Sequence, residues 1–217
     1  RDKQASSLFQ KPYEILIAGC GTGKQIMQDR QKYPNAQITA VDLSRSSIAY
    51  AQRKINEMGI KNVEIAQADI LELGSAFGDK KFDFVMCSGV LHHMHDPEAG
   101  LAVLKSLLKP EGQMNIGLYS EYAREKVVEY RAMVEEKGWS STVEGIRQLR
   151  EYVLSLENSD PMKAVAGWRD FYTTSMCRDL LFHVQEHRYT FPKLQDMFDR
   201  FDLSFLAYSY LPVSILQ

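Results

Sequence analysis

Short apolar runs rich in branched residues alternate, along the first half of the chain, with longer segments of helical character. The apolar runs cover residues 13–18, 36–41, 62–68, 82–87 and 113–119. The helical segments cover residues 24–32, 45–58 and 97–108. Continuous apolar runs of this length are typical of strands buried on both faces, and strands that alternate with helices form parallel sheets. The pattern therefore predicts an α/β fold, a doubly wound and mostly parallel sheet with helices on both faces.

Residues at the ends of these segments support the predicted boundaries. Ser44 is suited to cap the helix over 45–58, and Gly59 stands where a helix commonly stops. Pro97 follows an aspartate and opens the next helix at its first position. Between the elements, a loop and a turn are predicted at residues 74–81 and 109–112.

The alternation ends after residue 119. Two helices are predicted over 121–137 and 142–157, followed by an aromatic, mixed stretch over 160–190. A short helix over 191–200 and a last strand from Leu203 to Tyr210 complete the chain. We therefore expect a single domain over residues 1–217 that has three parts: a cofactor-binding core, a helical and aromatic lid insertion, and a C-terminal helix and strand, at residues 13–119, 120–190 and 191–217.

A glycine-rich turn follows the first predicted strand. Gly19, Gly21 and Gly23 alternate with Cys20 and Thr22, and a helix begins directly afterwards. Strand, glycine turn and helix form half of a nucleotide-binding unit, with free N–H groups expected at the helix start. The G-x-x-x-x-G-K-[ST] phosphate loop does not fit these residues, and neither does G-x-G-x-x-G, because position 24 is a lysine. A glycine turn that merely joins a strand to a helix remains an alternative.

Two carboxylates lie where ligands bind in open parallel sheets, at the carboxyl ends of strands. Asp42 ends the second predicted strand and could accept hydrogen bonds from ribose hydroxyls. Asp69 ends the third and could accept one from an adenine amine, with Ile70 packing on the base. The structural alternatives are a solvated turn aspartate and a helix-capping carboxylate.

Five sequence blocks, in order across residues 13–119, together resemble class I methyltransferases that use S-adenosylmethionine (SAM) and release S-adenosylhomocysteine (SAH). The blocks are IAGCGTG, AVDLS, QADIL, FDFVMCSGVLHHMHDP and LLKPEG. The resemblance implies a seven-stranded Rossmann-like sheet. It also implies a SAM site in which the glycine turn holds the methionine part, Asp42 the ribose and Asp69 the adenine, and the fourth strand end lies near the amino-acid end. The implied cofactor residues are Gly19, Cys20, Gly21, Gly23, Asp42, Leu43, Asp69, Ile70, Cys87 and Ser88.

Residues 117–124 and 177–190 are similar to a bacterial group of these methyltransferases that is often preceded by tetratricopeptide repeats. The sequence begins with Arg1 rather than methionine. Together these features lead us to expect a fragment of a longer protein, with neighbouring domains outside this sequence.

His183, Glu186 and His187 are the predicted acid–base cluster. If the segment is helical, the two histidines share one face and the glutamate lies one turn from His183. A methyl acceptor that must lose a proton needs such a base. The alternative is a helix end with a buried histidine. We further expect the stretch from Trp168 to Thr190 to close over the cofactor's methyl side.

Four further residues are predicted to bind the acceptor: Tyr119, Tyr122, Arg124 and Tyr172. A surface ion pair with a neighbouring glutamate is the alternative for Arg124, and lid packing is the alternative for the tyrosine at 172. A metal site usually needs ligands at fixed offsets with a partner elsewhere in the chain. The histidines at 92, 93 and 95 instead follow a strand end and precede a helix that begins with proline, so no metal is predicted. A general base at 92 or 93 remains an alternative.

Composition narrows the class of partner. The formal net charge is −2, which disfavours a nucleic-acid surface, and no apolar run approaches membrane-spanning length. Three widely spaced cysteines suggest a reducing cytoplasm. We expect a SAM-dependent methyltransferase acting on a small molecule or a protein. The alternatives are a non-catalytic SAM-binding or interaction module and an NAD-dependent oxidoreductase, which the lysine at position 24 disfavours.

Overall fold

The computed structural model describes residues 11–183 and 185–209, and the chain divides into two compact units. The sheet unit contains the residues up to Leu118 and those from Phe191 onward. The helical unit is the intervening segment Tyr119–Thr190. The single domain expected from the sequence therefore contains two compact bodies.

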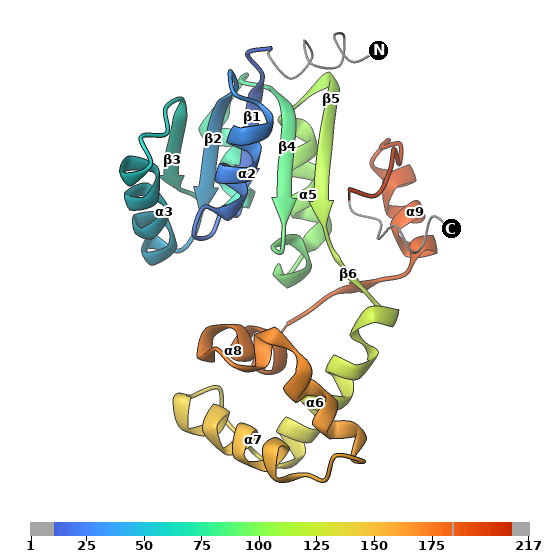
Figure 1. The fold of residues 1–217 in the computed structure, drawn as a ribbon. Helices are drawn as coiled ribbons and strands as arrows, with labels where there is room; N and C mark the ends of the chain where they lie inside the picture. Colours follow the sequence, from blue (N-terminus) through green and yellow to red (C-terminus); the bar gives the residue numbers. More distant parts are fainter. Residues whose placement is uncertain (1–10, 184, 210–217) are drawn as a thin grey trace, which may run out of the picture. The chain divides into compact units, whose positions relative to one another are not determined.

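The sheet unit is built on one parallel sheet with the strand order β3-β2-β1-β4-β5 (Figure 1). All four neighbouring pairs run parallel. The strands are added outward from β1 in one direction and then, from β4 onward, in the other. The end of β1 therefore lies at the centre of the sheet's carboxyl edge, where ligands bind in this architecture. The strands are β1 (Glu14–Ala18), β2 (Gln37–Asp42), β3 (Val63–Gln67), β4 (Phe82–Ser88) and β5 (Leu108–Gly117).

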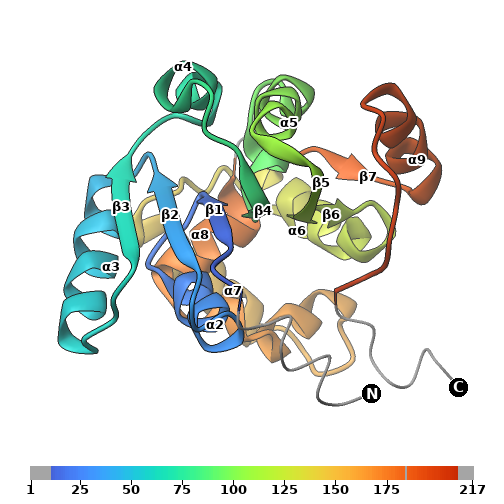
Figure 2. The ribbon, with the colours of Figure 1, turned by 90° about the horizontal axis from the view of Figure 1, so that it is seen from above.

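Helices cover both faces of the sheet, as Figure 2 shows from above. Helices α2 (Lys24–Lys32) and α3 (Arg45–Glu57) lie on one face, and α4 (Leu73–Phe77) and α5 (Pro97–Ser106) lie on the other. This arrangement confirms the doubly wound α/β fold. Helix α9 (Phe191–Arg200) is joined to α5 by an ion pair between Arg200 and Glu98.

The predicted helix boundaries are confirmed at their caps. The Ser44 hydroxyl accepts a hydrogen bond from the Ser47 amide at 3.2 Å, and Gly59 adopts φ +62° just past the helix end. Asp96 caps α5 by accepting from two amides of its first turn. These residues work through local geometry, which is why the sequence alone reveals them.

Branched side chains form the core between the sheet and α2 and α3. Ile15 and Ile17 of β1 lie against Ile26 of α2, Ile38 of β2 and Ile55 of α3, all almost fully buried. Each such side chain contributes about 1.5–3 kcal/mol through burial. This packing fixes the strand ends that carry the candidate site.

Four sequence predictions about the sheet unit are wrong in detail. The sheet of the described residues has five strands rather than seven, and residues 203–209 form no strand, while Tyr210 lies outside the described residues. Apolar character alone cannot make a strand, because a strand also needs a partner edge. The predicted turn at 109–112 is instead a register shift inside β5, and α4 occupies part of the predicted loop.

The helical unit has its own apolar core. Buried side chains from α6, α7 and α8 pack around Ile146, Leu149 and Phe171, and both tryptophans, Trp139 and Trp168, contact this core. The short strands β6 (Tyr119–Ser120) and β7 (Arg188–Tyr189) pair in parallel. The helices are η3 (Tyr122–Arg124), α6 (Glu125–Glu136), α7 (Val143–Ser155), η4 (Pro161–Gly167), η5 (Arg169–Phe171) and α8 (Thr174–Phe182).

Every helix within the described part of the chain is too short, or too polar, to cross a lipid bilayer.

Candidate functional site

The glycine turn is bound to the end of β2 through its backbone. The amides of Gly19 and Cys20 both donate to the Val41 carbonyl, at 2.8 and 2.9 Å, and the Gly23 amide donates to the Cys20 carbonyl at 2.9 Å. Gly19, Gly21 and Gly23 all have positive φ, at +81°, +52° and +88°. Glycine is the residue that adopts this conformation at little cost, so the three glycines explain the path of the turn.

The three glycines differ in what surrounds them. A Cβ on Gly19 would lie 2.1 Å from Cγ2 of Val90, and a Cβ on Gly23 would lie 3.0 Å from the Ala51 side chain. A Cβ on Gly21 would meet no described atom within 4 Å. Gly19 and Gly23 are therefore needed for contacts within the protein, whereas Gly21 presents its backbone to open space.

Asp42 connects the glycine turn to the turn that follows β2. One carboxylate oxygen accepts from the Gly21 amide at 2.8 Å, and the other accepts from the Ser44 amide at 2.8 Å. The amides of Gly19, Cys20, Gly21 and Gly23 all donate within the protein, so none of these four N–H groups is left over for a ligand. Asp42 also places a negative charge at the point where a phosphate site would present donors.

Asp69 caps the short helix η1 (Ile70–Glu72), where its carboxylate accepts from the Leu71 amide at 2.9 Å. Ile70 is buried, so little of its side chain can pack on a ligand. The exposed apolar neighbours of the two carboxylates are Leu43 and Leu71, at 62% and 47% exposure. Leu71, two residues past Asp69, was not named from the sequence, which pointed to the buried Ile70 instead.

The fourth strand contributes a buried thiol and an exposed hydroxyl. Burial raises the pKa of Cys87 to about 12, and burial together with the Asp42 charge raises the pKa of Cys20 to about 11. Neither thiol is therefore suited to act as a nucleophile. Ser88 is exposed, and its Oγ would lie 2.2 Å from a Cβ on Gly117 of the neighbouring strand. The absence of a side chain at Gly117 is what leaves room for Ser88.

The histidine-containing loop after β4 is a short helix, η2 (Leu91–His93). His92 is 1% exposed and its ring contacts that of His93, with 4.3 Å between the centroids. Such burial is typical of a histidine that shapes the loop rather than one that exchanges protons with solvent.

The predicted helical spacing of His183, Glu186 and His187 is wrong. Helix α8 ends at Phe182, and His183 adopts an extended conformation as its C-cap. Gln185 lies between the histidines: its backbone amide donates to Nδ1 of His183, and its side chain contacts Nε2 of His187, both at 3.4 Å. The histidines are therefore grouped by a glutamine contact and not by a helix face.

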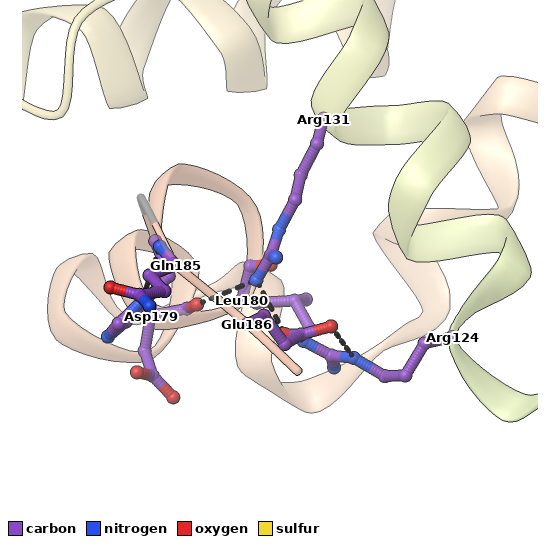
Figure 3. Close-up of polar contacts among 7 residues, drawn as sticks. Arg124, Arg131, Asp179, Leu180, Gln185 and Glu186 are labelled. Carbon is purple, nitrogen blue, oxygen red and sulfur yellow. Dashed lines mark hydrogen bonds and ion pairs between the residues drawn. The ribbon is translucent and has the colours of Figure 1, made fainter. Parts of the chain in front are cut away.

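Glu186 is held by two arginines (Figure 3). Its carboxylate accepts from Nε of Arg124 at 3.1 Å and from Arg131 at 2.9 Å, with a second, short contact to Arg124. Burial raises the pKa of this carboxyl, but the hydrogen bonds and charges of Arg124 and Arg131 outweigh burial and leave the pKa below its usual value. A carboxylate held in its ionised form is a poor general acid or base near neutral pH.

Arg124 is buried rather than part of a surface ion pair, and its guanidinium also lies 4.0 Å from the ring centroid of Tyr119. Tyr122 and Tyr172 are exposed at 73% and 59%, and the Tyr172 hydroxyl donates to the Ala166 carbonyl. Arg131, which completes the cluster, was missed from the sequence, because 55 residues separate it from Glu186 and no local pattern marks the pair.

Comparisons with known proteins give the family. A family model described as Methyltransferase domain matches residues 10–163. An uncharacterized protein of Synechococcus sp. is 30% identical over 206 residues, which cover 90% of this chain and 48% of that protein.

Solved structures agree on the fold. PKMT2 from Rickettsia typhi superposes with a TM-score of 0.70 at 24% identity, covering 87% of this chain and 38% of that chain. The same protein in complex with AdoHcy gives a TM-score of 0.67 at 23% identity, with 86% and 38% covered. The chain spans about half or less of the length of these relatives. Because the family match includes every strand of the parallel sheet, the chain belongs to the methyltransferase-domain family and has a class I, Rossmann-like fold, as the sequence blocks predicted.

Proposed function

We propose that this chain binds SAM at the carboxyl ends of β1 to β4 and transfers its methyl group to an acceptor. Membership of the methyltransferase-domain family supports the reaction. One observation carries the choice of ligand: the amides of the glycine turn are already bonded within the protein, and a carboxylate sits among them.

A glycine-rich phosphate loop holds the phosphate with the free backbone N–H groups of the loop itself. Here the amides of Gly19, Cys20, Gly21 and Gly23 are occupied, and Asp42 would repel a phosphate. SAM has no phosphate and carries a sulfonium and an ammonium cation, which a nearby carboxylate favours. The occupied amides also disfavour the pyrophosphate of NAD, and with it the oxidoreductase alternative.

The proposed contacts use groups that remain available. Each carboxylate oxygen has a second lone pair, so Asp42 can hold both its amides and the ribose hydroxyls. Asp69 has one oxygen beyond its cap to accept from adenine, and Leu43 offers an exposed apolar side chain to the base. The open backbone of Gly21 accommodates the methionine part, and Ser88 the amino-acid end. Cys20 and Cys87 line the site through their backbone, since both thiols are buried.

When bound, SAM supplies a methyl group on a sulfonium, which is a good leaving group. The protein's contribution is then to fix the geometry and to exclude competing reactions. On the acceptor side, His183 and His187 stay predicted bases, and Tyr119, Tyr122 and Tyr172 stay predicted contacts. We do not extend the proposal to Glu186 or Arg124, which bind each other. The acceptor is a small molecule or a protein.

We further propose a compartment for the protein, from the state of its cysteines. Cys20, Cys87 and Cys177 are all free and buried, which supports a reducing compartment such as the cytoplasm.

A SAM-binding module without catalysis is the second candidate, because the strand-end residues bind a ligand but perform no chemistry themselves. Release of SAH separates the two candidates: an enzyme forms it from SAM when an acceptor is present, and a binding module does not.

Titration calorimetry tests ligand choice directly. We expect saturable, micromolar binding of SAM and of SAH, and no saturable binding of NAD under the same conditions. Saturable NAD binding without any response to SAM or SAH would overturn the proposal.

A further inference from the structure

The helical unit is inserted between β5 and α9, so the chain must enter and leave it. It enters through β6 and leaves through β7, and we call this strand pair the neck. Among the described residues, the neck pairs only Tyr119 with Arg188 and Ser120 with Tyr189, and one further bond joins the Glu121 amide to the Tyr189 carbonyl at 2.9 Å. A two-stranded ladder of this size is marginal by itself in water.

Charged side chains stand at both sides of the neck. Arg124 follows β6 within η3, and Glu186, 62 positions further along the chain, precedes β7. Two nitrogens of the Arg124 guanidinium contact the two oxygens of the Glu186 carboxylate, the bidentate arrangement that Arg forms best (Figure 3). The Glu186 side chain is 3% exposed, so solvent screens this pair little.

Arg131 links the same carboxylate to the end of α8. It donates from Nε to the Leu180 carbonyl at 3.0 Å, and from a terminal nitrogen to the Asp179 carbonyl at 3.4 Å. The last carbonyls of a helix lack hydrogen-bond donors within the helix, and here an arginine from α6 donates to two of them. Glu186 then neutralises a charge that would otherwise be poorly compensated in a partly buried position.

The cluster also fixes its surroundings. The Tyr119 ring in β6 stacks on the Arg124 guanidinium, and Gln185, next to Glu186, contacts both His183 and His187. When Glu186 is held in place, the neighbouring Gln185 and His187 are therefore held in place as well.

We propose that Arg124, Arg131 and Glu186 form an electrostatic lock that closes the neck of the helical unit, and that Glu186 is a positioning residue for the two histidines rather than an acid–base catalyst. A buried ion pair adds little net stability compared with an apolar replacement, but removing one partner leaves an uncompensated charge. The lock therefore specifies that β6 pairs with β7 at the neck.

Glu186→Gln in the full chain tests the lock by amide hydrogen exchange and by NMR titration of the imidazoles. The matched control is Glu129→Gln on α6, which removes an exposed ion pair with Lys126. We expect the Glu121 amide and the residues of β7 to exchange at least tenfold faster in Glu186→Gln, and the imidazole signals of His183 and His187 to shift. Glu129→Gln should match the wild type, and amides of the sheet unit should stay protected in both variants.

Arg124→Lys keeps the charge but loses the bidentate geometry, so we expect a smaller increase in exchange at the same amides. This variant decides the question if Glu186→Gln does not fold. Exchange at the neck no faster than in Glu129→Gln, unchanged imidazole signals, or loss of protection spread evenly over both units would each overturn the lock. None of these measurements needs a bound ligand, so failure of the lock and failure of the proposed SAM site are distinguishable.

Discussion

The glycine turn and the neck lock hold their parts of the molecule by different means. In the turn, backbone amides bond to backbone carbonyls and to one carboxylate, and the bonded residues lie at most 22 positions apart. In the lock, three charged side chains meet across 62 and 55 positions. A site that depends on backbone conformation can be recognised in the sequence by its glycines. A site made of charged residues that are far apart in the sequence has no local pattern by which to recognise it.

The difference extends to what each region tolerates. The turn depends on the space around its backbone, so added atoms should damage it most. The lock depends on charge balance, so removal of charge should damage it most. Both tryptophans lie in the helical unit, so their fluorescence reports on that unit alone, while amide exchange resolved by residue also follows the sheet unit.

The largest expected effect in the sheet unit comes from Gly19→Ala. The added Cβ must displace Val90 and also adopt φ +81°, so we expect a loss of about 3 kcal/mol in stability from strain and overpacking. Denaturant unfolding monitored by amide exchange measures this loss of stability. The tryptophan fluorescence transition of the helical unit should stay where it is in the wild type.

Gly21→Ala is the matched control for that substitution. It has positive φ as well, but no described atom within 4 Å of its Cβ, so we expect a cost of only about 1 kcal/mol. Equal losses in the two variants would show that conformation alone, and not the Val90 contact, makes Gly19 necessary.

The next effect concerns ligand binding at Asp42. Asp42→Ala removes the acceptor for the Gly21 and Ser44 amides and for the proposed ribose hydroxyls, so SAH affinity should fall by about 1.5–3 kcal/mol. Titration calorimetry measures the loss, with Asp79→Ala, an exposed aspartate of the same unit, as the control. Unchanged SAH affinity in a folded Asp42→Ala protein would move the ribose to another residue.

The smallest effect is the acid dependence of the lock. The folded-state pKa of Glu186 lies below its unfolded value, so its stabilisation is complete above the unfolded pKa of about 4.3 and is lost as pH falls through the folded pKa. The stability difference between wild type and Glu186→Gln, read from tryptophan fluorescence, should therefore shrink on acidification. A difference that stays constant down to acid unfolding would contradict an ionised Glu186.

Much of the sheet unit could be predicted because its rules are local. The strands β1 to β4, the caps at Ser44 and Asp96, and the glycine turn all follow from neighbouring residues. The strand predicted from Leu203 is absent over residues 203–209, because whether this segment pairs depends on an edge far away in the sequence. The hydrogen bond from Gly21 to Asp42 was also hidden: the spacing showed a carboxylate near the turn but not that it occupies an amide.

The helical unit was less predictable for the same physical reason. The helices α6 and α7 were predicted from the sequence, but Glu186 was assigned to catalysis because helical spacing was assumed beyond Phe182, where α8 ends. Nothing near Glu186 in the sequence shows that Arg124 and Arg131 reach it. The role of a buried charged residue such as this one can therefore be assigned only when the structure shows which charged residues surround it.

A crystal structure of the chain with SAH tests the central claim most directly. We predict that SAH binds at the carboxyl ends of β1 to β4, with its ribose hydroxyls bonded to Asp42 while the Gly21 amide keeps its bond to the same carboxylate. SAH bound elsewhere, or bound with the Gly21 amide released from Asp42 and turned toward the ligand, would contradict it.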